Sequence, residues 1–211
     1  MAGSAGHELA LRAGLASYKP AEQHPWDAYY RSGILDYYGA LEELPRYAIL
    51  LGYLRFLGGN PAILDVGCGV GLLRARIGGI PFARYVGIDI SAEAIAQANE
   101  MADDRTTFLV APSPTGAPGP FDVVVLNEVL YYQEDPGRFL DEVYAALRPG
   151  GHLLTSIYRH RHDWALHEMI DARFQRVDVV LVCDENAGRA RRALGRGYKF
   201  RLALHRRRGP A

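Results

Sequence analysis

The sequence predicts an α/β protein with a doubly wound, mostly parallel sheet of seven strands, preceded by an N-terminal helical cap. Residues 121–126 form a run that is apolar except for Asp122, which suits a strand buried on both faces in the middle of a parallel sheet. Segments 62–66 and 84–90 are also strand-like, and helical stretches separate these runs. Strands that alternate with helices favour right-handed crossovers, with ligands bound outside the carboxyl ends of the strands.

Local signals give the boundaries of the expected elements. Pro45 is tolerated in the first turn of a helix over 43–57, and Gly58-Gly59 ends that helix. Ser91 is a good N-cap for the helix that follows it. Four prolines between residues 112 and 120 exclude regular structure there. The result is a Rossmann-like arrangement with strands at 62–66, 84–90, 106–110, 121–126, 152–157, 176–183 and 198–205, and helices at 43–57, 72–77, 91–101, 136–147 and 164–174.

The chain divides into an N-terminal helical extension and cap over residues 1–57 and a ligand-binding domain over residues 58–211. Aromatic residues are spaced so that one amphipathic helix could present part of them on one face. A packing stripe is the favoured interpretation, and a cap that closes over a ligand pocket is the alternative. These aromatic residues are Trp26, Tyr29, Tyr30, Tyr37 and Tyr38.

Composition narrows the classes of partner. Lysine plus arginine equals aspartate plus glutamate at 24 each, so no overall positive field favours nucleic acid. No apolar run approaches the ~20 residues of a membrane span, and the first residues do not resemble a signal peptide. The two cysteines, Cys68 and Cys183, do not suggest a disulfide framework. We therefore expect a cytoplasmic monomer or homodimer that binds neither membrane nor nucleic acid.

Polar residues end three of the expected strands. Asp65 follows the first apolar run, Asp89 the second, and Asn127-Glu128 the fourth. The carboxyl ends of parallel strands lie at one edge of the sheet, so these side chains should gather there. Directly after Asp65, the alternate glycines of Gly67-Cys68-Gly69-Val70-Gly71 leave the backbone free of Cβ atoms where a ligand must come close. The sequence therefore predicts a nucleotide-type cradle at this edge.

Four segments together resemble the successive motifs of class I S-adenosylmethionine-dependent methyltransferases. The resemblance covers about residues 60–160, and its order and spacing are more specific than a glycine turn alone. The run 127–132 further resembles small-molecule methyltransferases of the natural-product and nodulation-factor type. The segments that carry the family resemblance are Asp65–Gly71, Val86–Asp89, Phe121–Glu128 and Leu147–Gly151.

The resemblance implies S-adenosylmethionine as the cofactor and assigns a role to each motif. Asp89 would accept the ribose hydroxyls, Ile90 would pack on adenine, and the glycine backbone would approach the methionine and ribose. The family often has an acid after the third strand, where this chain has Ala111-Pro112-Ser113, so the adenine contact would fall to backbone or Ser113. The expected cofactor-binding residues are Asp65, Gly67, Cys68, Gly69, Gly71, Asp89, Ile90, Asn127 and Glu128.

The implied reaction is an in-line methyl transfer to an oxygen or nitrogen atom of a small-molecule acceptor. A general base is needed only for a protonated acceptor, and the candidates are Glu128, Tyr131 and His160, with His162 beside them. For both histidines an ordinary loop position is an equal alternative. The spacing of His162, His167 and Glu168 fits no familiar zinc pattern, so we expect no metal.

Other functions stay open at this point. A dinucleotide oxidoreductase is disfavoured because its third glycine would fall at Leu72. A non-catalytic protein that keeps the S-adenosylmethionine cradle is a second alternative. The arginines of loop 184–197 could attract an acidic acceptor, although a solvated loop is the favoured interpretation. Nucleic-acid amino methyltransferases are disfavoured because no Pro-Pro-aromatic run follows Asn127.

Overall fold

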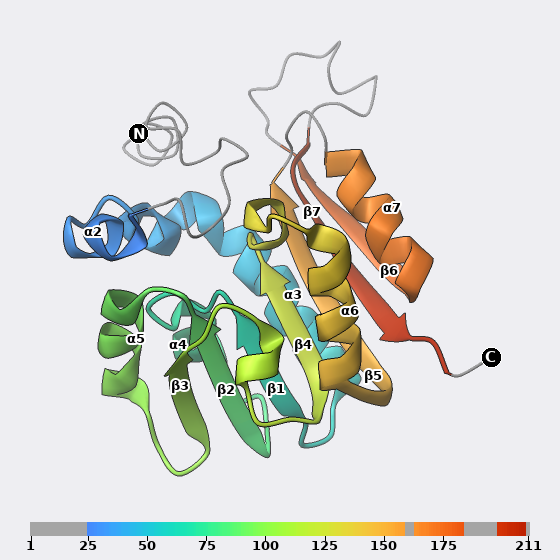
Figure 1. Ribbon diagram of the computed structural model, residues 1–211, viewed down its shortest axis with the longest axis horizontal. Helices are drawn as coiled ribbons and strands as arrows, with labels where there is room; N and C mark the ends of the chain where they lie inside the picture. Colours follow the sequence, from blue (N-terminus) through green and yellow to red (C-terminus); the bar gives the residue numbers. More distant parts are fainter. Residues whose placement is uncertain (1–24, 159–162, 184–197, 210–211) are drawn as a thin grey trace.

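The computed structural model describes residues 25–158, 163–183 and 198–209, which form a seven-stranded sheet between two layers of helices (Figure 1). The spatial order is β3-β2-β1-β4-β5-β7-β6. Strand β7 pairs antiparallel with both β5 and β6, so β6 runs in the same direction as the first five strands. The expected mostly parallel, doubly wound sheet is confirmed. Its strands are β1 (Ala62–Val66), β2 (Arg84–Asp89), β3 (Thr106–Val110), β4 (Phe121–Asn127), β5 (Leu147–Tyr158), β6 (Phe174–Cys183) and β7 (Tyr198–Arg207).

Alternation along the strands divides the core between the two faces of the sheet. Ile63 packs on one face with α3 (Leu44–Leu57), α4 (Leu72–Arg76) and α5 (Ala92–Ala98). Leu64 packs on the other face with α6 (Pro136–Ala146) and α7 (Asp163–Arg173). Among the described residues, no helix combines the length and the apolarity that a membrane span requires.

The element boundaries differ from the sequence-based ones in a few places. Strand β5 begins at Leu147 instead of residue 152, because Leu147 pairs with Phe121 beyond an irregularity in the β4–β5 register. The helix after Ser91 ends at Ala98 and continues as a 3₁₀ turn, η4 (Asn99–Met101). The proline segment expected to lack regular structure contains one 3₁₀ turn, η5 (Pro114–Gly116).

The aromatic N-terminal segment does not form a single helix, and that expectation is wrong. Gly33 takes a left-handed conformation (φ 73°), which ends α2 (Trp26–Arg31) after six residues. The chain continues through the 3₁₀ turns η2 (Asp36–Gly39) and η3 (Leu41–Glu43) into α3. The aromatic side chains pack together around Leu35, as the packing interpretation expected. The domain boundary after residue 57 stays a prediction.

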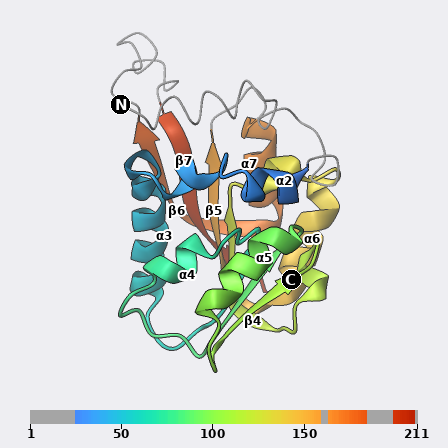
Figure 2. The ribbon, with the colours of Figure 1, turned by 90° about the vertical axis from the view of Figure 1, so that its left-hand side faces the viewer.

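Helix α2 is held against the N-terminus of α5 (Figure 2). The Asp27 carboxylate accepts the Ser91 hydroxyl at 2.6 Å and the Glu93 amide at 3.1 Å. Ser91 in turn caps α5 through the Ala94 amide. The Asp27 carboxylate therefore connects the N-terminal helical segment to α5, the helix that follows Asp89.

Candidate cofactor and acceptor site

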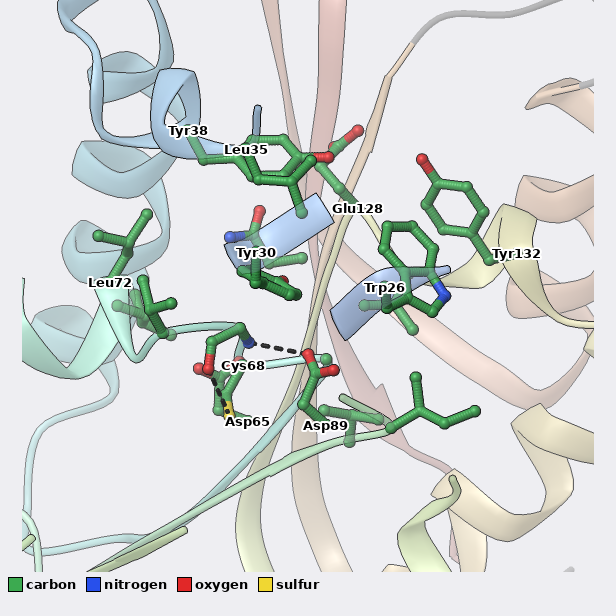
Figure 3. A pocket seen from close by; sticks show the side chains of 18 of the residues that line it. Trp26, Tyr30, Leu35, Tyr38, Asp65, Cys68, Leu72, Asp89, Glu128 and Tyr132 are labelled. Atoms are coloured by element: carbon green, nitrogen blue, oxygen red, sulfur yellow. Dashed lines mark hydrogen bonds between the residues drawn. The ribbon is translucent and has the colours of Figure 1, made fainter. Parts of the chain in front are cut away.

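A cavity of about 290 Å³ lies at the carboxyl ends of β1, β2 and β4 (Figure 3). The glycine turn, defined here as Gly67–Gly71, and the polar strand ends form one side of it. Residues of α2, η2 and α3 form the opposite side. The expected gathering of Asp65, Asp89 and Asn127-Glu128 at one edge is therefore found around a single cavity.

The glycine turn brings main chain, without side chains, to the cavity wall. Gly67 has φ 68°, and a Cβ atom there would collide with the Val129 side chain. Gly69 has φ 53°, and its Cβ would lie 2.8 Å from the Tyr30 hydroxyl. Both positions combine a backbone conformation that L-residues rarely adopt with a lack of space, so glycine is required there.

Asp89 is fixed by the backbone on both carboxylate oxygens. Oδ2 accepts the Gly69 amide and Oδ1 accepts the Ser91 amide, each at 2.9 Å. The side chain is buried, which raises the pKa of its carboxyl, while these amides lower it. Two of its roughly four acceptor positions remain, which suits a pair of neighbouring ligand hydroxyls.

Asp65 lines the same cavity but is engaged by a neighbouring strand. The Tyr85 hydroxyl donates to its carboxylate. Burial raises the pKa of Asp65 to about 7, an effect that the Tyr85 hydroxyl opposes and the Asp89 charge reinforces. Beside it, the buried Cys68 thiol points to the Gly69 carbonyl oxygen at 3.5 Å.

The far end of the cavity has an apolar wall. Ile90, Ala111 and Pro112 line it. The Ser113 hydroxyl shares a hydrogen bond with Thr115 at 2.8 Å instead of lining the cavity. An adenine ring at this end would meet apolar surface and main chain.

Glu128 sits at the opposite end in a strained conformation. It is the one non-glycine residue of the described chain with positive φ (66°), and it is only 8% exposed. Oε1 accepts the Ser156 hydroxyl at 2.6 Å, and Oε2 accepts the Tyr131 hydroxyl and the Tyr158 amide, both at 2.9 Å. Burial raises the pKa of Glu128, whereas the Arg46 charge and the hydroxyl donors lower it. One of its roughly four acceptor positions stays open.

The other candidates for the general base are Tyr131, His160 and His162. The Tyr131 hydroxyl donates to Glu128, and burial raises the pKa of Tyr131 well above its usual value. His160 and His162 lie outside the described residues, as do the arginines of loop 184–197. His167 is buried on α7, and the part of the chain that the structure describes contains no group of three or more potential metal ligands.

Arg46 is a cavity residue that the sequence did not reveal. It is 2% exposed, and its Nη1 donates to Asn127 Oδ1 at 2.7 Å across a separation of 81 residues. Its Nε donates to Glu43 at 2.8 Å. The available signal was a Glu-x-x-Arg pair at helical spacing beside Tyr47 and Leu50, which is also typical of a solvated helix face.

An aromatic roof, defined as Trp26, Tyr30, Tyr38 and Tyr132, covers the cavity. The Trp26 and Tyr132 rings meet edge to face with centroids 5.1 Å apart. Figure 3 shows Tyr38, Trp26 and Tyr132 on the Glu128 side of the cavity, away from Asp65. The alternative interpretation of the aromatic segment, a cap over a pocket, therefore agrees with the structure as well.

Comparison with known proteins gives the family. A sequence profile described as a methyltransferase domain matches residues 40–185. The ubiquinone biosynthesis O-methyltransferase of Bradyrhizobium sp. (strain ORS 278) is 38% identical over 104 residues, which cover 44% of this chain and 38% of the relative. The chain spans about a third of the length of the curated relatives that it matches first.

Solved methyltransferase structures share the fold. The N-methyltransferase NodS from Bradyrhizobium japonicum WM9, in complex with S-adenosylhomocysteine, aligns with TM-score 0.64 and 21% identity over 94% of this chain and 97% of its own. The 1,6-didemethyltoxoflavin-N1-methyltransferase of Burkholderia thailandensis aligns with TM-score 0.67 and 22% identity, covering 86% and 84%. Because the profile spans more than half of the chain, the chain belongs to the methyltransferase domain family, and it has the fold of class I S-adenosylmethionine-dependent methyltransferases.

Proposed function

We propose that the chain transfers a methyl group from S-adenosylmethionine to an oxygen or nitrogen atom of a small molecule held beneath the aromatic roof. The observation that carries the proposal is the cavity itself. A backbone-fixed carboxylate, Asp89, stands at one end, and a buried carboxylate among aromatic rings, Glu128, stands at the other. When bound, the cofactor supplies a methyl group already activated on a sulfonium ion.

The cofactor end has partners for each part of the ligand. Asp89 keeps acceptor positions on both oxygens for the two ribose hydroxyls, and charge-assisted bonds of this kind are among the stronger ones in proteins. The glycine turn admits the ligand close to main chain. Ile90, Ala111 and Pro112 offer apolar surface to the adenine. The cavity therefore fits the cofactor without the acid that the family often has after the third strand.

At the acceptor end, the protein's contribution is orientation and exclusion of water. Aligning two reactants in a dry site can lower a barrier by ~7 to 11 kcal/mol, so the roof can act without a strong base. Glu128 is the base candidate inside the cavity, since burial raises its pKa and one acceptor position remains. Tyr131 would act through Glu128, and His160 remains a candidate from the sequence alone.

The cofactor assignment is tested by calorimetry with S-adenosylhomocysteine on the wild type and on Asp89→Ala. Loss of the ribose contacts should cost about 3 kcal/mol, or roughly a hundredfold in affinity. Asp104→Ala, which removes an exposed carboxylate from a turn remote from the cavity, is the matched control. Equal affinities for the wild type and Asp89→Ala would refute the proposal.

Catalysis is tested by following radiolabelled methyl transfer to a panel of phenols, alcohols and amines. The panel also separates the proposed function from that of a non-catalytic binding protein. Transfer to any of these acceptors supports the enzyme. Tight cofactor binding with no transfer to oxygen or nitrogen acceptors would favour the binding protein.

A further inference from the structure

The two glutamates that are buried in the described part of the chain, Glu43 and Glu128, have different partners. The Glu43 carboxylate forms two ion pairs, one with Arg46 Nε and one with the Lys199 ammonium, both at 2.8 Å. Glu128 forms no ion pair with any described residue. Because a buried charge normally has a partner of opposite charge, the surroundings of Glu128 need an explanation.

Neutral donors hold the Glu128 carboxylate in place of a cation. They are the Ser156 hydroxyl at 2.6 Å and the Tyr131 hydroxyl and Tyr158 amide at 2.9 Å. The Arg46 charge lowers the pKa of Glu128 through space, but the Arg46 nitrogens donate to other residues. Glu128 lines the cavity, and one of its roughly four acceptor positions is open. A ligand with a cationic N–H donor would therefore supply the missing charge.

Aromatic rings make the same end of the cavity favourable for a cation. Tyr38, Trp26 and Tyr132 lie on the Glu128 side, as Figure 3 shows. The Trp26 and Tyr132 rings meet edge to face with centroids 5.1 Å apart. The face of an aromatic ring carries negative potential, and it attracts ammonium groups most strongly in desolvated sites. A buried carboxylate and several rings together are typical of a binding site for an ammonium ion.

The charges around the cavity favour the same class of ligand. Among the described residues that line it, Arg46 is the one Lys or Arg, and the others with formal charge are carboxylates. Two of these carboxylates, Asp36 and Glu134, belong to exposed residues, so their field reaches the solvent. An excess of negative charge attracts cations and repels anions. The carboxylates are Asp36, Asp65, Asp89, Glu128 and Glu134.

Building on the proposed function, we propose that the methyl acceptor is an amine, bound as its ammonium ion between Glu128 and the rings of Trp26 and Tyr132. The ammonium ion donates a hydrogen bond to the open acceptor position of Glu128. Glu128 then takes one proton: an N–H bond breaks, the proton moves to a carboxylate oxygen, and the nitrogen keeps the lone pair with which it attacks the methyl group. An alcohol or a phenol would leave Glu128 without a cation.

Pairs of probe ligands that differ in charge but little in shape test the proposal. The pairs are benzylamine with benzyl alcohol, phenethylamine with phenethyl alcohol, and cyclohexylmethylamine with cyclohexylmethanol. Calorimetry near neutral pH measures their binding to protein saturated with S-adenosylhomocysteine. We expect the wild type to bind the ammonium member of at least one pair about tenfold or more tightly than its alcohol, because it gains a charged hydrogen bond.

Variants on the two sides of the site show whether the carboxylate and the rings cause this preference. Glu128→Gln should reduce it to less than about twofold and should change the affinity for S-adenosylhomocysteine by less than about threefold. Trp26→Leu should reduce the preference about threefold to tenfold, and Trp26→Phe, which keeps a ring, should preserve most of it. Glu100→Gln is the matched control, because Glu100 is exposed and does not line the cavity. It should leave the preference unchanged.

Several results would overturn the proposal. One is a wild type that binds none of the ammonium ions more tightly than the matching alcohol. Another is a Glu128→Gln variant that keeps the preference but loses affinity for S-adenosylhomocysteine, since Glu128 would then bind the amino group of the cofactor. Methyl transfer to alcohols or phenols and not to amines would overturn the proposal and leave the proposed function standing. Failure of the wild type to bind S-adenosylhomocysteine would contradict the cofactor assignment on which the proposal rests.

Discussion

The two sides of the cavity are built by different means. The glycine turn and Asp89 form a floor made largely by main chain. The Asp89 carboxylate accepts the backbone amide of Gly69, which lies only 20 residues earlier in the sequence. The opposite side consists of side chains, and all of them except Tyr132, which follows β4, come from the cap. Trp26 meets Tyr132, and Arg46 reaches Asn127 across 81 residues.

This difference matches the two tasks of a methyltransferase. The cofactor presents the same groups in every enzyme of the class, so a short local pattern is sufficient to hold its adenosyl end. The acceptor changes from one enzyme to another, and long-range side-chain contacts can vary without disturbing the sheet. Changes in the floor should therefore affect stability and cofactor binding together, whereas changes in the roof should leave the core intact.

The largest effect is expected from Gly67→Ala in the floor. The left-handed conformation costs an added Cβ about 1–2 kcal/mol, and its collision with Val129 costs about 1–3 more. Urea denaturation should show a loss of about 2–5 kcal/mol in the free energy of unfolding. Gly79→Ala is the control, because no atom lies within 4 Å of its added Cβ, and it should change stability by less than about 1 kcal/mol. Similar losses of stability for the two variants would show that the backbone at Gly67 does not require glycine.

An intermediate effect, of opposite sign, is expected from Asp65→Asn. Burial raises the pKa of Asp65 from 3.8 to about 7, so the folded state favours the protonated carboxyl. Its stabilising contribution is present below pH 4 and is lost as the pH rises through about 7. The amide cannot ionise, so the variant should be more stable than wild type by up to about 4 kcal/mol at pH 8 and nearly equal at pH 4.

Urea titrations at the two pH values check this expectation. Asp104→Asn, which changes an exposed carboxylate, should show no such dependence. A stability difference for Asp65→Asn that is the same at pH 4 and pH 8 would show that the carboxylate of the floor is not strained by burial.

The floor and the sheet could be predicted from the sequence because their signals are local. Strands 62–66 and 106–110 were predicted with the observed bounds, and Asp89 was expected at the cavity from its place at a strand end. The start of β5 at Leu147 was missed because it depends on pairing with Phe121, which no local signal reports.

The roof was predicted only in outline, for a physical reason. The spacing of the aromatic residues allowed a continuous helix, and one left-handed glycine, Gly33, redirects the chain instead. Arg46 resembled an ordinary helix-surface arginine until tertiary contacts placed Asn127 and Lys199 around it. Both cases depend on partners distant in sequence, so residue spacing alone could not resolve them.

The smallest effect on the core is expected when the roof is released at Asp27. Asp27→Ala removes the acceptor of the Ser91 hydroxyl and of the Glu93 amide, which hold α2 against α5. In a Trp164→Phe background, Trp26 is the one remaining tryptophan and reports on the roof alone. We expect its emission to shift to the red and amide exchange in residues 26–39 to accelerate, while the urea midpoint of the core stays unchanged. Glu100→Ala, an exposed change at the other end of the same helical segment, should leave the emission unchanged. A fall in the urea midpoint that accompanies the red shift would mean that roof and floor unfold as one unit. The two sides of the cavity would then differ in how far the sequence predicts them, but not in their stability.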